Sequence, residues 1–248
     1  MMQNNSPYRF RDGLRDGLPI GLGYLSVSFG FGITAVAEGL RVLETLLISM
    51  TNLTSAGQVA GVTVIIAAGT LLEMVLTQLV INLRYSLMGI TLSQRLDGRC
   101  TTPHRMLMSF GMTDEIFAVA SSKPHSVCPS YFYGLMTLPY VGWAGGTLLG
   151  ALAGQILPVG IRAAMGIMIY AMFIAIVLPP AKRERGVLYT VLIAAALSCV
   201  VWYLPLLDWI SEGFSIILCA VLAATVMAIV RPVSDGDRLD DTDAGGEG

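Results

Sequence analysis

The sequence predicts an all-α polytopic membrane protein with about seven or eight transmembrane segments. Of its 248 residues, 54% are hydrophobic and only 13% are charged, which lies outside the range of soluble globular proteins. Several apolar runs reach the ~20 residues that a helix needs to span about 30 Å of hydrocarbon. These runs lack the two-residue alternation of an outer-membrane barrel strand, and only helices would then satisfy their backbone hydrogen bonds in lipid.

Eight candidate segments follow one another along the chain. They are Gly17–Ala37, Thr45–Ala68, Leu71–Leu92, Met106–Ala120, Tyr131–Gly154, Ala163–Leu178, Val187–Leu207 and Phe214–Val230. We expect a single transmembrane transporter domain over residues 17–230, preceded by an N-terminal segment at 1–16 and followed by a disordered acidic tail at 231–248. Residues 1–16 lack the layout of a cleavable signal peptide, so the first span is expected to stay in the mature protein.

The segment Thr45–Ala68 is apolar at both ends and polar in its middle, from Thr51 to Gln58. A segment at bilayer depth with so many hydrogen-bonding side chains can be locally unwound, as in transporters whose helices break beside the substrate. Alternatively, these side chains only bond neighbouring helices. Both interpretations stay open.

Three placements are open for the segment Met106–Ala120. Its ~15 residues fit a short span, a re-entrant hairpin or an interfacial helix. If it crosses the membrane, the basic loop Arg95–Arg105 falls outside, against the preference of Lys and Arg for the cytoplasmic side. If it does not cross, the basic N-terminus moves outside unless Thr45–Ala68 is also re-entrant. We favour eight membrane segments.

The segment Leu71–Leu92 carries a polar side at bilayer depth, made of Glu73, Thr77, Gln78, Asn82 and Arg84. An arginine in this position costs about 2.5–3.5 kcal/mol and normally faces a cavity or a carboxylate. Arg84 stands roughly 12 Å from the end of the helix at 1.5 Å per residue, which is far for snorkelling to the interface. We therefore expect Arg84 to hold a carboxylate, either from a substrate or from the protein.

Asp114 and Glu115 are the candidate partners of Arg84 within the chain. Neighbouring residues on a helix diverge by about 100°, so one of them can pair with Arg84 while the other titrates as a proton carrier. Glu73 competes for the role of proton carrier, and an interfacial helix whose acids face water remains the alternative. Neutral groups for the ammonium and carboxylate of a zwitterion are expected from Asn52, Ser55, Gln58 and Asn82.

Small residues mark the expected helix contacts. A glycine recurs at every fourth residue, at Gly142, Gly146, Gly150 and Gly154, which indicates close helix packing within the chain or against a small partner subunit. Gly17–Ala37 and Tyr131–Gly154 are both glycine-rich, so a diverged internal repeat of the kind common in transporters is an open interpretation.

Other residue types argue against several functions. No basic face with interleaved aromatic residues suggests nucleic-acid binding. The four cysteines form no CxxC pair and the two histidines lie in loops, so we expect no disulfide framework, no metal site and no cofactor. An intramembrane enzyme is not expected, because HExxH and GxSxG motifs are absent from the sequence.

Four segments read together resemble the AzlC family, the large permease subunit of branched-chain amino acid exporters. They are GLRDGLPIGLGYLSVSFGFG (13–32), TSAGQ (54–58), VINLRYSLMGITL (80–92) and GMTDEIFA (111–118), and YAMFIAIVLP (170–179) is similar to a later family segment. Two departures concern the substrate more than the fold. Leu53 to Gly57 replace the family's usual aromatic and alanine-glycine-alanine run, and Tyr85 stands where a histidine is usual.

The resemblance implies a multi-pass protein of the cytoplasmic (inner) membrane that exports small apolar amino acids such as valine, leucine, isoleucine or methionine. It also implies a separately encoded small AzlD-type membrane subunit as partner, and an ion gradient, of H⁺ or Na⁺, as driving force. The alternative is a non-transporting membrane scaffold or assembly subunit of a transport complex.

Overall fold

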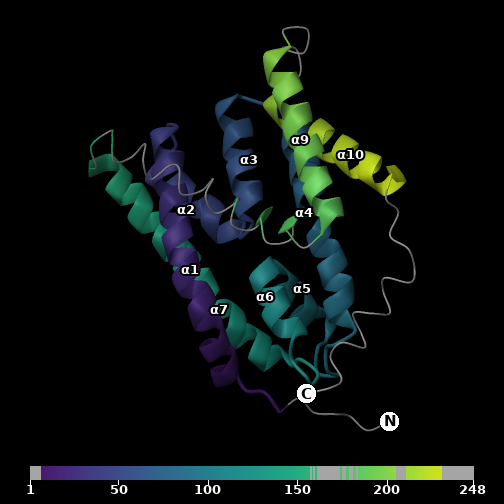
Figure 1. The fold of residues 1–248 in the computed structure, drawn as a ribbon. Helices are drawn as coiled ribbons and strands as arrows, with labels where there is room; N and C mark the ends of the chain where they lie inside the picture. Colours follow the sequence, from purple (N-terminus) through teal and green to yellow (C-terminus); the bar gives the residue numbers. More distant parts are fainter. Residues whose placement is uncertain are drawn as a thin grey trace. The chain divides into compact units, whose positions relative to one another are not determined.

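The computed structural model describes residues 7–156, 184–204 and 211–230, with isolated positions between 158 and 182, and its regular elements are helices (Figure 1). The all-helical prediction is therefore confirmed. The predicted segment Ala163–Leu178 falls almost entirely outside the described residues, as does the tail at 231–248. The helices are α1 (Phe10–Ala37), α2 (Val42–Thr51), α3 (Ser55–Ile66), α4 (Leu71–Ser93), α5 (Thr102–Phe110), α6 (Asp114–Ser121), α7 (Pro129–Ile156), α9 (Arg185–Tyr203) and α10 (Glu212–Val230).

Five of the described helices are long and apolar enough to cross a membrane, namely α1, α4, α7, α9 and α10, while α2 and α3 are shorter apolar helices. The chain divides into two compact units, Met1–Phe173 and Ile174–Gly248. Helices α1 to α7 belong to the first unit, and α9 packs against α10 in the second. The candidate site lies in the first unit.

The first unit is built on α1 and α7, which run side by side in the same direction. Gly13 at the start of α1 contacts Tyr131 at the start of α7, and Gly32 near the end of α1 contacts Thr147. The backbones approach so closely that a Cβ added at Gly21 would stand only 2.8 Å from the carbonyl oxygen of Leu138. Such an approach is open only to glycine, so these residues fix the two helices against each other.

Helices α2 and α3 form a hairpin, called here the first hairpin, with its tip at Asn52–Leu53–Thr54. Asn52 (φ −139°, ψ 113°) and Thr54 (φ −89°, ψ 104°) have extended backbone, which ends α2 and starts α3. Leu40, just before α2, and Val62, late in α3, share one apolar cluster with Phe31 near the end of α1. The chain therefore turns back at the tip, and of the two interpretations left open for Thr45–Ala68, the structure contains the local break in the helix.

Helices α5 and α6 form a second hairpin, with its tip at Gly111–Met112–Thr113. His104 in the first turn of α5 is hydrogen-bonded to the Tyr133 hydroxyl at 2.7 Å, and Ser121 at the end of α6 accepts a 2.9 Å hydrogen bond from Arg95 through its carbonyl. Both legs of the hairpin thus start and finish near the beginning of α7. Of the three forms left open for Met106–Ala120, the structure contains the hairpin.

The two hairpins enter the first unit from opposite ends, because α4 runs opposite to α1 and α7 (Figure 1). Gly69, just before α4, lies beside Val64 of α3, whereas Leu92 at the other end of α4 packs with Tyr131. A long helix followed by a hairpin therefore occurs twice, as α1 to α3 and inverted as α4 to α6. This repeated pattern differs from the one suggested by the two glycine-rich helices, since α7 lies outside it.

This arrangement resolves the conflict over basic residues. Because each hairpin returns to the end from which it came, the N-terminal segment and both connections of the second hairpin share one end, and Lys123 forms a 2.8 Å ion pair there with Asp16. The shared basic end carries Arg9, Arg11, Arg15, Arg95, Arg99, Arg105 and Lys123. The opposite end of α1 leads to Arg41, which is paired with Glu44.

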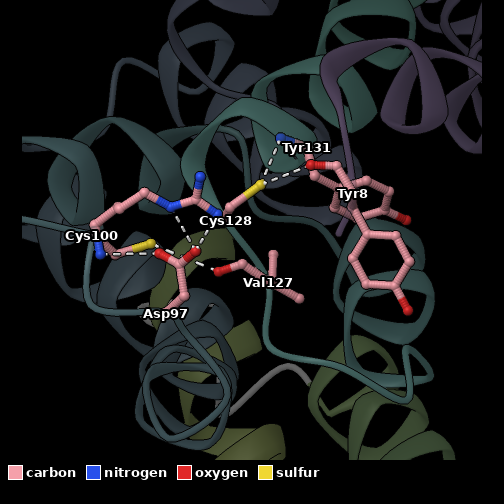
Figure 2. Close-up of polar contacts among 7 residues, drawn as sticks. Tyr8, Asp97, Cys100, Val127, Cys128 and Tyr131 are labelled. Atoms are coloured by element: carbon pink, nitrogen blue, oxygen red, sulfur yellow. Dashed lines mark hydrogen bonds and ion pairs between the residues drawn. The ribbon is translucent and has the colours of Figure 1, made fainter. Parts of the chain in front are cut away.

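The basic end is held together by backbone and thiol contacts (Figure 2). The Asp97 amide donates to the carbonyl oxygen of Val127 at 3.0 Å, and the Cys128 thiol donates to the carbonyl oxygen of Tyr8 at 3.2 Å. Cys100 is buried beside them, with its thiol 3.7 Å from the same Val127 oxygen. The connection after α4 and the N-terminal segment are thereby both fastened to the start of α7.

Candidate functional site

Polar side chains of α4 meet the tip of the first hairpin. Gln78 donates from its amide nitrogen to the carbonyl oxygen of Gly57 at 2.7 Å, and its amide oxygen accepts from Asn52 at 3.5 Å. A Cβ at Gly57 would stand 2.7 Å from that amide oxygen, so the missing side chain gives Gln78 its access to the backbone. Asn52 also accepts the backbone N–H of Thr54 at 3.0 Å, which stabilises the broken backbone.

Gln58 also stabilises the break between α2 and α3, through contacts with α2 and α7. Its side chain is 1% exposed, and its amide nitrogen donates to the carbonyl oxygen of Asn52 and, at 3.3 Å, to the Ser49 hydroxyl. Its amide oxygen accepts the indole N–H of Trp143 on α7 at 3.2 Å. Gln58, predicted to touch substrate, therefore has internal partners at both ends of its amide.

Asn82 stands one turn after Gln78 on α4. Its amide nitrogen donates to the backbone oxygen of Gln78 at 2.8 Å and to the side-chain oxygen at 3.1 Å. The side-chain oxygen of Asn82 is buried and has no hydrogen-bond partner among the described residues. Such an oxygen is costly unless a donor reaches it, so a bound ligand with an N–H group would stabilise this position. Ser55, half-buried in the first turn of α3, is the nearby predicted residue on the first hairpin.

The tip of the second hairpin brings a carboxylate to Arg84. Nη1 of Arg84 lies 2.8 Å from Oδ2 of Asp114, in the first turn of α6, where a negative charge also interacts favourably with the helix dipole. Nη2 of Arg84 donates to the Tyr85 hydroxyl at 3.1 Å. The side chains of Arg84 and Asp114 are 43% and 30% exposed, so this ion pair is accessible at one side.

Glu115 faces away from this ion pair. Its carboxylate accepts a hydrogen bond from the hydroxyl of Tyr24 on α1, and Tyr24 is 9% exposed. The divergence expected for neighbouring residues on a helix therefore sends Asp114 to α4 and Glu115 to α1. Two adjacent carboxylates thus have different partners, a guanidinium and a phenol.

Glu73 does not lie near the Arg84–Asp114 ion pair or near Glu115. It is 3% exposed in the first turn of α4, beside Gly69, and its backbone N–H is capped by the Thr70 hydroxyl at 3.2 Å. Arg84 lies eleven residues further along α4, or about 16 Å at 1.5 Å per residue. Glu73 therefore belongs to the opposite end of the unit.

The four predicted packing glycines all lie against α1. A Cβ at Gly142 would stand 3.2 Å from the Cα of Gly21, and Gly146 and Gly150 approach the carbonyl oxygens of Leu25 and Phe29. Gly154 has room, with Ile33 at 3.4 Å. This packing sets Trp143 beside Tyr24, whose ring centroid is 5.1 Å away at an interplanar angle of 74°.

Sequence reasoning missed Tyr24, Tyr85 and Trp143 as members of the cluster. A usable signal was present for Trp143, since a tryptophan inside a glycine ladder lies at bilayer depth rather than at the interface where tryptophan is enriched.

A cavity of about 370 Å³ opens elsewhere, at the basic end, between Arg99, His104 and Tyr133. None of the predicted site residues lines it. Within the described residues, no three His, Cys, Asp or Glu side chains gather in a way that could hold a metal ion.

These features define a polytopic helical membrane protein in which two broken-helix hairpins carry polar groups to a central helix. The family model described as AzlC protein matches residues 19–157. The Inner membrane protein YgaZ of Escherichia coli (strain K12) is 30% identical over 235 residues, covering 91% of this chain and 94% of that protein. The chain belongs to the AzlC family.

More distant relatives are also membrane proteins. An uncharacterized membrane protein of Archaeoglobus fulgidus is 33% identical over 178 residues, covering 71% of this chain and 78% of that protein. One from Helicobacter pylori (strain 26695) is 25% identical over 150 residues, covering 59% of this chain and 64% of that protein. No solved structure matches the chain significantly.

Proposed function

We propose that the chain is the large subunit of a secondary transporter that exports branched-chain or similar small apolar amino acids. The observation that carries the proposal is the approach of both hairpin tips to α4, through Asn52–Gln78 on one side and Arg84–Asp114 on the other. Transporters use broken helices of this kind to present backbone and side-chain polar groups to a substrate at membrane depth. The family resemblance supplies the substrate class.

The ion pair matches the two charges of an amino acid. Arg84 and Asp114 are joined by one contact at 2.8 Å and remain partly exposed, so a zwitterion can exchange with the pair. The substrate carboxylate then binds the planar guanidinium of Arg84, while its ammonium faces Asp114. This binding mode assigns the charged ends of the substrate and leaves its apolar side chain to neighbouring Leu and Met residues.

Glu115 is the proposed proton carrier. Its hydrogen-bond partner among the described residues is the Tyr24 phenol rather than a cation, so taking up a proton breaks no ion pair there. Asp114 is engaged by Arg84, and Glu73 lies at the other end of the unit. We therefore propose H⁺ as the coupling ion. The proposed function is transport without a catalysed reaction.

The basic end is proposed to face the cytoplasm of a cell whose inner membrane holds the protein, because Lys and Arg in short connections are retained on that side. The first hairpin then opens from the outer side and the second from the cytoplasmic side. A small AzlD-type subunit is the proposed partner on the strength of the resemblance. The alternative, a non-transporting scaffold, requires that polar substitutions alter complex formation but not solute flux.

The test is reconstitution of the chain with its small subunit in proteoliposomes, with efflux of labelled valine, leucine, isoleucine and methionine measured under an imposed pH gradient. Arg84→Ala and Asp114→Asn are expected to abolish gradient-dependent flux. Arg41→Ala is the matched control, since the Arg41–Glu44 pair at the opposite end is exposed, and its flux should stay at the unsubstituted level. Unchanged flux in both Arg84→Ala and Asp114→Asn would overturn the proposal.

A further inference from the structure

The two hairpin tips are connected to each other by a second route, which does not pass through α4. On the side of the second hairpin, the Tyr24 hydroxyl donates to the Glu115 carboxylate. On the side of the first hairpin, the indole N–H of Trp143 donates to Gln58 at 3.2 Å. Tyr24 and Trp143 meet edge to face, with ring centroids 5.1 Å apart. A continuous chain of contacts therefore runs from Glu115 to the break in the first hairpin.

Each contact on this route is well placed to transmit a small displacement. Trp143 and Gln58 are 2% and 1% exposed, so neither has a solvent-filled space into which it can relax. Gln58 in turn donates to the carbonyl oxygen of Asn52, which ends α2. A shift of the indole thus reaches the extended backbone at the tip.

The helices that carry the aromatic pair are packed against each other at backbone contact. Gly21 and Gly142 bring the backbones of α1 and α7 into contact just beside Tyr24 and Trp143. Movement of one hairpin therefore has to occur against this helix pair rather than with it. The side chains of Tyr24 and Trp143 are the parts of the pair that contact both hairpins.

We propose that Tyr24 and Trp143 are positioning residues that transmit the protonation state of Glu115 to the first hairpin. This inference rests on the proposed proton-coupled function and adds the residues that link the ion to the outer hairpin. Ionised Glu115 accepts the Tyr24 O–H. When Glu115 takes a proton from solvent, it becomes a weaker acceptor, the phenol moves, and the indole and Gln58 follow. Tyr24 keeps its own proton throughout, and the proton on Glu115 later returns to solvent.

The pH response of Glu115 must be distinguished from that of the titratable and charged groups around it. They are Tyr24 from α1, Arg84 and Tyr85 from α4, and the adjacent Asp114 of α6. Asp114→Asn removes the neighbouring carboxylate and keeps Glu115, whereas Glu115→Gln keeps Asp114 and removes the proposed proton site. A pH response carried by Glu115 survives the first substitution and not the second.

The experiment uses Trp143 as its own reporter. The chain has three tryptophans, so Trp202 and Trp209, together with every tryptophan of the small subunit, are replaced by Phe, which leaves Trp143 as the only one in the reconstituted complex. Its fluorescence emission is measured across pH, and a reversible change with a single midpoint is expected. The change should be lost in Glu115→Gln and in Tyr24→Phe, which keeps the ring but removes the hydroxyl.

Tyr140→Phe is the matched control, because it removes a hydroxyl on α7 that donates to the backbone oxygen of Met50 at 3.1 Å and should keep the response. A pH response that persists in Tyr24→Phe, or a parent protein whose Trp143 emission does not change with pH, would overturn the inference. Thermal unfolding of each variant shows whether it is folded. If the response follows the expected pattern but no amino acid flux is found, the proposed function fails and the link stands.

Discussion

The Arg84 guanidinium and the Asp114 carboxylate, 2.8 Å apart, join the helix that crosses the first unit to the tip of the second hairpin. Asp114 begins α6, so its position depends on the chain turning back at Gly111–Thr113. A continuous helix over Met106–Ala120 would place the same carboxylate inside a regular helix. The ion pair is therefore a consequence of the hairpin.

Removing one partner of this ion pair should destabilise the protein more than removing both. Leaving a single buried charge costs about 3–5 kcal/mol, and the partial exposure of Arg84 and Asp114 puts the expected cost below that range. The double variant Arg84→Ala with Asp114→Asn should thus unfold at a higher temperature than either single variant in detergent. Additive losses in the double variant would show that the two side chains do not form a pair.

The glycine contacts between α1 and α7 predict a graded set of alanine effects. Gly142→Ala should destabilise the protein by about 1–3 kcal/mol, since the new Cβ meets backbone of α1 that has no room to move. Gly145→Ala is the matched control, because nothing lies within 4 Å of its Cβ, and Gly154→Ala should fall close to it. Thermal unfolding in detergent measures all three. Equal effects at Gly142 and Gly145 would contradict the packing.

The inverted hairpins predict which connections share a side of the membrane. Single cysteines at Arg11, Gly98 and Glu38, all exposed, are introduced into a variant without the native cysteines. An impermeant maleimide applied to inside-out vesicles should label Arg11→Cys and Gly98→Cys, and applied to right-side-out vesicles it should label Glu38→Cys. Labelling of Arg11→Cys and Gly98→Cys from opposite sides would mean that the first hairpin, which lies between these two positions, crosses the membrane.

Cys100 should react slowly with alkylating reagents. Burial raises the pKa of its thiol to about 11, so the reactive thiolate is scarce near pH 8 and increases as the pH rises toward that value. Iodoacetamide modification of Cys100, followed by mass spectrometry, should therefore be minor at pH 8 and grow steeply above it. Gly98→Cys, exposed in the same connection, provides the comparison and should react fully at pH 8.

Much of the fold follows from local sequence features, while the pairings do not. The polar residues at Thr51–Gln58 predict a break because they supply hydrogen bonds that an unwound backbone needs, and Asn52 does cap Thr54. The second hairpin is one of three forms that a segment of ~15 residues fits, so length alone does not select it over the short span or the interfacial helix. The charge distribution favours re-entrant hairpins only when both are considered together.

Contacts between residues far apart in the sequence could not be predicted from local patterns. Tyr24 and Glu115, like Trp143 and Gln58, are brought together by the register of α1 on α7, which depends on which glycine faces which carbonyl. Arg84 was predicted to find a carboxylate because an unpaired charge at that depth is costly. Its choice of Asp114 over Glu115 is set by the orientation of α6.

Substrate is proposed to bind where the two hairpin tips meet α4, and a site-protection assay measures binding at this position. Ser55→Cys, at the start of α3, is introduced into the variant without native cysteines, and its alkylation rate is measured with and without saturating valine. The rate is expected to fall several-fold with valine, and this protection should vanish in Arg84→Ala. An unchanged rate in a preparation that transports valine would contradict the claim.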